Sequence, residues 1–266
     1  MKLGFIGCGN MGSALMKAAL KKVSADEIII SDHHTGLLEE YAKSFGIRTG
    51  SSGDVASDAK FVFIGVKPQG LKALFDEIGD TIRSRSDRFI IVSMAAGIAV
   101  KQICSFIGKD VPVIRIMPNT PVSVGEGMIL YTANSLVSAD EIDEFCDSIS
   151  RSGSLDSIDE SKIDAASAIS GCGPAFVDLF IEAMADGGVE CGLPRQKALL
   201  YAAQTLLGSA KLMLDSGKHP AELKDAVCSP AGSTIAGVHA LENGAFRSNV
   251  INAVVSAYER TKELGK

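Results

Sequence analysis

The sequence predicts an α/β domain followed by an all-helical region, and two observations carry this prediction. Short apolar runs alternate with helical patterns over roughly the first 157 residues. From Lys162 onward there is no convincing strand, only long helical segments separated by glycine and proline. Alternation of strands and helices is typical of an open sheet with helices on both faces, so the first part is interpreted as such a sheet.

Six apolar runs predict the strands. Each is too short for a helix, and most are apolar on both faces, as a parallel sheet covered by helices requires. The runs lie at residues 2–7, 27–31, 61–66, 89–94, 113–117 and 127–132. The helical patterns of this part lie at Met11–Lys22, Leu37–Phe45, Gly70–Ser84, Val100–Ile107 and Ala139–Ser150.

The second part predicts a helical domain that associates with a second copy of itself. Its helical segments lie at residues 162–170, 175–187, 195–215, 220–227, 234–242 and 247–263. Several are apolar nearly all round, for example KALLYAAQTLLGSAKLML, and such a helix must be buried on more than one side. A domain this small cannot surround several such helices, which predicts an obligate homodimer. An unusually buried monomeric core is the alternative. The predicted domains are 1–158 and 159–266.

Composition excludes several classes of protein. The chain has 266 residues, 46% of them hydrophobic and 22% charged, with a net charge of −6, scattered basic residues and no tryptophan. This indicates a globular protein without a nucleic-acid surface. The apolar runs are shorter than a membrane span, and the first residues do not resemble a signal peptide. The six cysteines form no CxxC pair, so we expect reduced thiols, a cytoplasmic protein and no metal site.

A glycine motif directly after the first predicted strand indicates the cofactor. Gly7-Cys8-Gly9-Asn10-Met11-Gly12 opens the first helix, and Asp32 lies at the end of the second strand. In a dinucleotide-binding domain of the Rossmann type, the first glycine permits a tight turn and the second lets the backbone approach a pyrophosphate. The third lets the helix lie close to the strand, and the helix N-terminus faces the phosphates. A turn that serves packing only is the alternative.

Asp32 bears on which dinucleotide binds. A carboxylate at that position accepts hydrogen bonds from the adenosine ribose and repels a 2′-phosphate, which favours NADH over NADPH. His33 and His34 follow and could soften this repulsion when protonated.

Three further loops leave the carboxyl ends of predicted strands, where ligands of open α/β sheets bind. They carry Val66-Lys67-Pro68, Ala95-Ala96-Gly97 and Asn119. Lys67 is interpreted either as catalytic or as orienting the cofactor. The predicted cofactor-binding residues are Ile6, Gly7, Gly9, Asn10, Met11, Gly12, Asp32, Val66, Lys67, Pro68, Ala95, Ala96, Gly97 and Asn119.

The motifs of both parts together resemble those of pyrroline-5-carboxylate reductase, the last enzyme of proline biosynthesis. The resemblance covers essentially the whole chain. It includes FIGCGNMG, GVKPQ, SMAAGI and RIMPNTPVSVGEG in the first part, and SGCGPAFV, DGGVECGLPR, HPAELKDAVCSPAGSTIAGVHALE and FRSNVINAV in the second. Three positions depart from the family pattern: Ala231 stands in place of the usual glycine, Cys172 in place of serine and Gly53 in place of an expected asparagine.

The resemblance implies a fold, a reaction and an assembly. It implies a Rossmann domain followed by an all-helical dimerisation domain, with dimers assembled into larger rings. The expected reaction is reduction of 1-pyrroline-5-carboxylate to proline with NADPH or NADH. The active site is expected between the cofactor of one subunit and the turn at residues 229–234, donated by the partner.

The turn SPAGST at residues 229–234 suits this substrate, a cyclic imine that carries a carboxylate. The backbone N–H groups of Gly232, Ser233 and Thr234 would form a carboxylate cradle at a helix start, and Ser229 would add a donor. Thr234 is the predicted catalytic residue, its hydroxyl donating to the imine nitrogen. No metal is required. The alternative is that Ser233 or Thr234 only caps the helix.

Two other classes of protein remain as alternatives. A β-hydroxyacid dehydrogenase would need a lysine followed four residues later by asparagine, but Ala166 follows Lys162 and Asp215 follows Lys211 at this spacing. A non-catalytic dinucleotide sensor would need the first part of the chain and have no use for the turn at 229–234.

Overall fold

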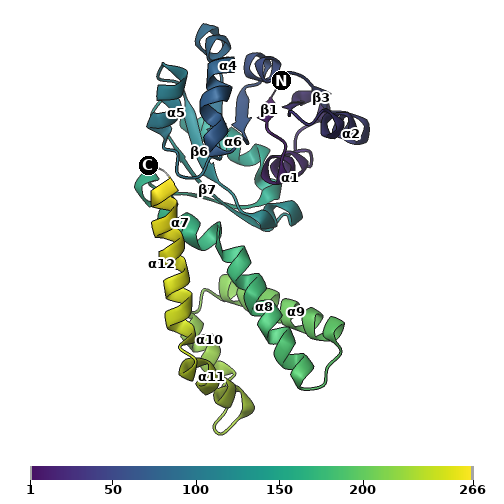
Figure 1. The fold of residues 1–266 in the computed structure, drawn as a ribbon, viewed down its shortest axis with the longest axis vertical. Coiled ribbons are helices and arrows are strands. Elements are labelled where there is room, and N and C mark those ends of the chain that lie inside the picture. Colours follow the sequence, from purple (N-terminus) through teal and green to yellow (C-terminus); the bar gives the residue numbers. More distant parts are fainter. Residues whose placement is uncertain (1, 265–266) are drawn as a thin grey trace. The chain divides into compact units, whose positions relative to one another are not determined.

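The computed structural model describes residues 2–264 and divides into two compact units. The first comprises Met1–Cys172 together with a stretch that begins at Ala257, and the second comprises Gly173–Ser256 (Figure 1). The first unit thus extends beyond residue 158, because helix α7 (Glu160–Ser170) belongs to it. The predicted boundary between residues 158 and 159 stays a prediction.

The first unit is built on one sheet in the order β3-β2-β1-β4-β5-β6-β7-β8. The first six strands in this order, β3-β2-β1-β4-β5-β6, are arranged as in a Rossmann domain. The strands are β1 Leu3–Ile6, β2 Ile28–Ser31, β3 Arg48–Thr49, β4 Phe61–Ile64, β5 Ile90–Ser93, β6 Val113–Met117, β7 Gly127–Ala133 and β8 Gly153–Ser157. The six predicted strands all form. Strands β3 and β8 were not predicted, because one has two exposed residues and the other is largely polar.

The sheet is not wholly parallel, contrary to the expectation from its apolar runs. Strand β7 runs antiparallel to β6, whereas all other pairs, including β7 with β8, are parallel. The reason is the short connection between β6 and β7, which holds only a 3₁₀ turn at Thr120–Val124. A parallel crossover needs a dozen or more residues, so this connection forces the strand to return antiparallel.

Twelve α-helices form within residues 2–264, and eleven of them match the predicted segments. They are α1 Asn10–Ala19, α2 Thr35–Phe45, α3 Ser52–Asp58, α4 Leu71–Ser84, α5 Val100–Ile107, α6 Ala139–Ser148, α7 Glu160–Ser170, α8 Gly173–Glu190, α9 Arg195–Ser216, α10 Pro220–Ala226, α11 Ser233–Asn243 and α12 Phe246–Leu264. The unpredicted helix α3 is a polar two-turn segment whose start is fixed by a capping box between Ser51 and Asp54.

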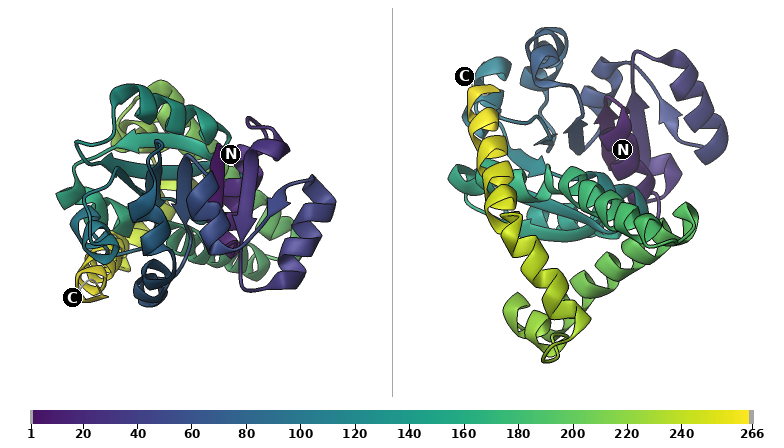
Figure 2. Two further views of the ribbon diagram at one scale, coloured as in Figure 1. Left: turned by 90° about the horizontal axis from the view of Figure 1, so that it is seen from above. Right: turned by 60° about the horizontal axis from the view of Figure 1, so that its bottom comes forward.

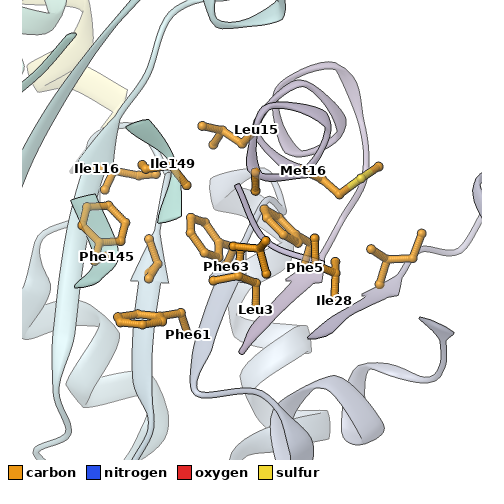
Figure 3. Close-up of a cluster of buried hydrophobic side chains, with 14 of the residues drawn as sticks. Leu3, Phe5, Leu15, Met16, Ile28, Phe61, Phe63, Ile116, Phe145 and Ile149 are labelled. Carbon is orange, nitrogen blue, oxygen red and sulfur yellow. The ribbon is translucent and has the colours of Figure 1, made fainter. Parts of the chain in front are cut away.

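Helices cover both faces of the sheet in the first unit (Figure 2). Alternate residues of the strands point to opposite faces, so Phe61 and Phe63 of β4 join one apolar cluster and Val62 and Ile64 join the other. In the first cluster, shown in Figure 3, Phe5 and Phe63 stack with ring centroids 4.5 Å apart. These two clusters hold the strand ends in place, and the loops that leave those ends form the site described below.

The second unit buries very little by itself. Helices α8 and α9 lie against each other (Figure 1), yet only Ala185, Ala198 and Ala202 are buried within Gly173–Ser256. Three leucines at intervals of seven on α9, Leu200, Leu207 and Leu214, are 63%, 59% and 75% exposed. Residues seven apart lie on the same face of a helix, so these leucines form a continuous apolar stripe on the single chain.

One helical segment, Glu160–Glu190, is long and apolar enough to cross a membrane by length and composition alone, although the sequence analysis expected no such span. Three acidic residues, Asp178, Glu182 and Asp186, recur at intervals of four in its second half. Four-residue spacing places them along one face of the helix, and charged groups in a membrane are costly. The apolar faces of this segment therefore fit a protein interface better than lipid.

Candidate active site

The glycine elbow after β1 has the geometry that the motif predicts. Gly7 adopts a φ of +90°, a conformation that other residues rarely adopt. A Cβ atom at Gly12 would lie 2.1 Å from the carbonyl oxygen of Gly7, so only glycine lets α1 start this close to the strand. The turn at Gly7 and the close approach of α1 at Gly12 are required by the fold itself, without any ligand. They confirm the predicted reasons for these two glycines.

Gly9 differs from these two glycines. A Cβ atom at this position would meet no atom of the chain within 4 Å, and its φ of −62° suits any residue. The N–H groups of Asn10, Met11 and Gly12 follow it at the start of α1, where no side chain caps the helix and the first turn holds no acidic residue. Helix N-termini of this kind attract phosphate. The open space at Gly9 and the free donors therefore fit a dinucleotide pyrophosphate.

Asp32 lies beside this elbow, at the end of β2. One carboxylate oxygen accepts a hydrogen bond from the backbone N–H of Cys8 at 2.6 Å, and the other accepts from the backbone N–H of His34 at 2.9 Å. The carboxylate is thereby held at the position from which an acidic residue binds a ribose hydroxyl in dinucleotide-binding domains. His33 and His34 are both exposed, and a ring nitrogen of each and an oxygen of the Asp32 carboxylate lie within 4.8 Å of one another.

Cys8 lies inside the elbow but carries no chemistry there. Its side chain is 1% exposed, and burial, followed by the charge of Asp32, raises the pKa of its thiol to about 12. The thiol therefore stays protonated at neutral pH and behaves as a small apolar side chain.

The other predicted cofactor loops lie at the same edge of the sheet. Val66, Lys67 and Pro68 follow β4, and Ala95, Ala96 and Gly97 follow β5. The side chain of Lys67 is exposed and forms no hydrogen bond or ion pair with residues 2–264, so it is available to a ligand. Ile6 is 3% exposed, its side chain belongs to the apolar core, and its carbonyl accepts a hydrogen bond from the N–H of Gly65 at 2.8 Å. Its described contacts therefore position the elbow.

The Asn119 side chain, in the loop after β6, forms its hydrogen bonds with other residues of the first unit. Its side-chain N–H donates to the carbonyl of Ser170 at 2.9 Å, and its side-chain oxygen accepts from the N–H of Met128 at 2.9 Å. The residue is 9% exposed. Its amide thus ties the loop after β6 to α7 and β7, which is a positioning role that the sequence did not predict.

The turn at residues 229–234 leads into α11 in the second unit. The N–H of Gly232 donates to the carbonyl of Ser229 at 3.0 Å, so it is not free for a ligand as the sequence analysis expected. The first N–H bonded within the helix belongs to Ala236, which leaves the N–H groups of Ser233 and Thr234 without intrahelical partners. The carboxylate cradle is therefore offered by these two residues.

The hydroxyl groups of this turn are free. Those of Ser229, Ser233 and Thr234 form no hydrogen bond with any residue that the structure describes, and no side chain caps α11. This disfavours the alternative that Ser233 or Thr234 only caps the helix. A Cβ atom at Gly232 would lie 2.3 Å from the Ser229 hydroxyl oxygen, so any other residue there would force this hydroxyl to move. Ala231 adopts a φ of +59°, which glycine would adopt without strain.

Sequence reasoning missed one group of residues near the cofactor loops. Arg115 on β6 forms ion pairs with Glu160 and Asp164 of α7, with nitrogen-to-oxygen distances of 3.5 and 2.5 Å. The signal in the sequence was a single charged residue within the apolar run VIRIM, because an arginine in a strand buried on both faces requires an ionic partner.

The first unit therefore has the features of a dinucleotide-binding domain: Rossmann strand order, a glycine elbow with free N–H donors, and a carboxylate fixed at the end of β2. Joined to a helical unit with exposed apolar faces, it defines the class of nicotinamide-dependent oxidoreductases that associate through a helical domain.

Comparisons with known proteins identify the family. Residues 160–264 match the family described as pyrroline-5-carboxylate reductase dimerisation, and residues 2–97 match that described as NADP oxidoreductase, coenzyme F420-dependent. The pyrroline-5-carboxylate reductases of Methanosarcina acetivorans and Escherichia coli are both 38% identical to this chain, covering 100% of it and 98% of each relative.

The solved structure of Plasmodium falciparum pyrroline carboxylate reductase with NADP bound has a TM-score of 0.89 and 31% identity, covering 100% of this chain and 98% of that one. The chain belongs to the pyrroline-5-carboxylate reductase family. This confirms the fold, the enzyme class and the nicotinamide cofactor that the sequence analysis predicted. The helical part is accordingly an oligomerisation domain.

Proposed function

We propose that the chain reduces the C=N bond of 1-pyrroline-5-carboxylate to give proline, with the residues of the elbow and of the turn at 229–234 in separate roles. Full-length similarity to reductases of this name supports the reaction. The single structural observation that supports the division of roles is the set of free donors at the start of α11. When bound, NAD(P)H supplies the hydride.

The elbow and the strand-end loops hold the coenzyme. The N–H groups of Asn10, Met11 and Gly12 bind its pyrophosphate, and Asp32 binds the adenosine ribose. Val66–Pro68 and Ala95–Gly97 line the nicotinamide end, with their backbone close to the ring. Ile6 fixes the start of the elbow through its hydrogen bond with Gly65, and Asn119 holds the last of these loops in place.

The turn at 229–234 holds the substrate. Its carboxylate is bound by the N–H groups of Ser233 and Thr234 and by the Ser229 hydroxyl, at a helix N-terminus that favours an anion. The Thr234 hydroxyl donates to the ring nitrogen as the imine carbon is reduced. A protonated imine is already electrophilic, so catalysis depends on orientation more than on a strong acid.

Alanine substitution of Thr234 tests this assignment. The Thr234→Ala variant should lose about 10²-fold in kcat, because general acid assistance and orientation have this magnitude, with an unchanged dissociation constant for the coenzyme. The matched Thr234→Ser variant keeps a hydroxyl and should retain most of the activity. Absorbance of NAD(P)H at steady state measures both. A Thr234→Ala enzyme with the wild-type kcat would remove Thr234 from the mechanism.

The same assay separates the alternatives. The proposal is supported if the enzyme oxidises NAD(P)H with pyrroline-5-carboxylate and does not reduce NAD(P)+ with hydroxyacids. Turnover of a hydroxyacid instead would favour a β-hydroxyacid dehydrogenase. Tight coenzyme binding without turnover of any imine would favour a dinucleotide sensor.

We further propose that the enzyme prefers NADH. The Asp32 carboxylate is fixed by two backbone N–H groups, so it cannot easily move away from a 2′-phosphate, and two like charges at about 4 Å repel by about 4 kcal/mol near a protein surface. The ratio of kcat/KM for NADH to that for NADPH should exceed one and fall about tenfold or more in Asp32→Asn. His33→Ala is the control and should change the ratio little. A large NADPH preference in the wild type contradicts this proposal.

For the assembly, we propose a homodimer through the helical unit, with dimers arranged in a larger ring and the turn of one subunit serving the coenzyme of its partner. A cytoplasmic location is proposed for the enzyme, since its cysteines are free thiols. The mass of the assembly in solution, measured by light scattering, tests the ring.

A further inference from the structure

Arg115 stands out in the first unit because it is a charged residue at the centre of a sheet. It is 3% exposed, and no other charged residue within residues 2–263 is so completely buried. Its strand neighbours are Ser93 of β5 and Thr132 of β7. Neither neighbour carries a charge, so the partners of the guanidinium must come from outside the sheet.

Those partners come from the first turns of α7. Asp164 accepts a hydrogen bond from the guanidinium at 2.5 Å, and Glu160 lies 3.5 Å from its other terminal nitrogen. The same Glu160 oxygen also accepts a hydrogen bond from the N–H of Val100, the first residue of α5, at 2.7 Å. One carboxylate therefore connects β6, α7 and the start of α5.

A second link holds the other end of α7. The Asn119 side chain donates to the carbonyl of Ser170, the last residue of the helix. Helix α7 is thus fixed at its start by Arg115 and at its end by Asn119, two residues from one strand and the loop that follows it. The loop carrying Ala95–Gly97 leads directly into α5, whose first N–H is held by Glu160. Both loops that follow β5 and β6 are consequently fastened to one helix.

This arrangement is not explained by stability. The Nε of Arg115 is buried and has no hydrogen-bond partner among the described residues, and an unsatisfied buried donor opposes folding. The Glu160 and Asp164 side chains are 37% and 30% exposed, so solvent weakens both ion pairs, and even fully buried ion pairs are often replaceable by apolar residues without loss of stability. An arginine kept at this cost has its clearest use in fixing the geometry of the groups that it joins.

We propose that Arg115, with Glu160 and Asp164, is a positioning residue for hydride transfer: it fastens the loops after β5 and β6 to α7 and so fixes the nicotinamide end of the coenzyme site. The inference rests on the proposed placement of the coenzyme at this edge of the sheet. The pyrophosphate and ribose contacts lie at β1 and β2, away from this cluster, so coenzyme affinity should depend on it weakly and the rate of hydride transfer strongly.

The test compares Arg115→Met with Arg115→Lys in the full-length enzyme. Arg115→Met should lower kcat by about tenfold to a hundredfold, as small misplacements of reacting groups do, while KM for the coenzyme changes by less than about threefold. The isotope effect with coenzyme deuterated at the transferred position should rise, because hydride transfer becomes rate-limiting. Arg115→Lys keeps the charge and one bond to Asp164, so it should recover part of the rate.

A matched control is available at the opposite edge of the sheet. The Arg85 side chain is 5% exposed, donates to the carbonyls of Ala56 and Ala59, and pairs with Asp87. Arg85→Met removes an equally buried guanidinium and should lower the melting temperature without changing kcat or the isotope effect. Equal kinetic losses in Arg85→Met and Arg115→Met would overturn the proposal, since both would then report general destabilisation.

Two milder variants keep the proposal testable if Arg115→Met does not fold. Asp164→Asn and Glu160→Gln retain the accepting oxygens and remove one charge each, and each should lower kcat by about two- to fivefold. Unchanged kcat and isotope effect in folded Arg115→Met, or in both of these variants, overturns the inference. Wild-type turnover of pyrroline-5-carboxylate tests the proposed function separately. If it fails, the fluorescence of bound NADH, which reports the surroundings of the nicotinamide, still distinguishes Arg115→Met from Arg85→Met.

Discussion

The two units of this chain bury their apolar residues very differently. In the unit built on the sheet, two clusters of large apolar side chains are buried on either side of the strands. Within Gly173–Ser256 only three alanines are buried, and many large apolar side chains lie exposed on the single chain. The first unit therefore completes its own core, whereas the second requires the corresponding surface of another subunit, as its family match to a dimerisation domain indicates.

The largest expected effect comes from charging the apolar stripe of the second unit. Leu207→Asp places a carboxylate in the centre of the stripe on α9, and burying it without a partner costs several kcal/mol, so the dimer should dissociate or fail to form. Light scattering should give the mass of a single chain or of aggregates, with loss of reductase activity. The control Leu136→Asp, at a 45% exposed position in the first unit, should leave the dimer intact. A Leu207→Asp dimer as stable as the wild type would break the comparison between the two units.

A second prediction sharpens the description of the first unit by separating folding from binding within one motif. Gly12→Ala inserts a Cβ atom against the carbonyl of Gly7 and should lower the free energy of unfolding by about 1–3 kcal/mol, as overpacking does. Gly9→Ala projects a methyl group into open space and should cost about 1 kcal/mol or less as a helix cap.

The two variants should rank in the opposite order for coenzyme affinity and for the free energy of unfolding. Compared with the wild type, Gly9→Ala should raise the dissociation constant for NADH by about tenfold or more, because the methyl group occupies the proposed pyrophosphate position. Its effect on the free energy of unfolding should be small. Chemical denaturation and fluorescence titration measure the two quantities. Equal coenzyme affinity in Gly9→Ala and wild type would show that the elbow does not approach a ligand at Gly9.

The smallest expected effect concerns backbone strain. Among the described residues, the non-glycine residues with positive φ all lie in the second unit. Its non-glycine residues with positive φ are Ala231 and Ala245, at +59° and +56°. Replacing either by glycine removes about 1–2 kcal/mol of strain and adds about 0.5–1 kcal/mol of chain entropy cost, so each variant should be stabilised by about 0–1.5 kcal/mol. Only Ala231→Gly, within the turn proposed to bind the substrate, should also change KM for pyrroline-5-carboxylate. Two destabilised variants would contradict this.

The sequence predicted those parts of the molecule that short-range patterns determine. The apolar runs located six strands, and Gly7, Gly12 and Asp32 lie where the motif requires. Strand β3 was missed because two exposed residues carry no pattern, and β7 was expected to be parallel because apolar content does not reveal direction.

The remaining differences concern side-chain partners far apart in the sequence. Asn119 and Ser170 are joined across about fifty residues, and Arg115 reaches α7 over a similar interval, so neither contact has a local signature. The free hydroxyl of Thr234 likewise depends on what surrounds the start of α11, and only the structure shows that no described residue uses it.

The buried thiol within the glycine elbow makes the enzyme resistant to oxidation and alkylation at this position. Electrophiles and peroxides attack the thiolate, and a pKa of about 12 leaves Cys8 almost none of it at neutral pH. A reactive cysteine between the two glycines proposed to lie at the coenzyme would otherwise be a point at which oxidative stress stops proline synthesis. Because Cys8 is buried, alkylating reagents should modify the exposed Cys191 first and leave coenzyme binding unchanged.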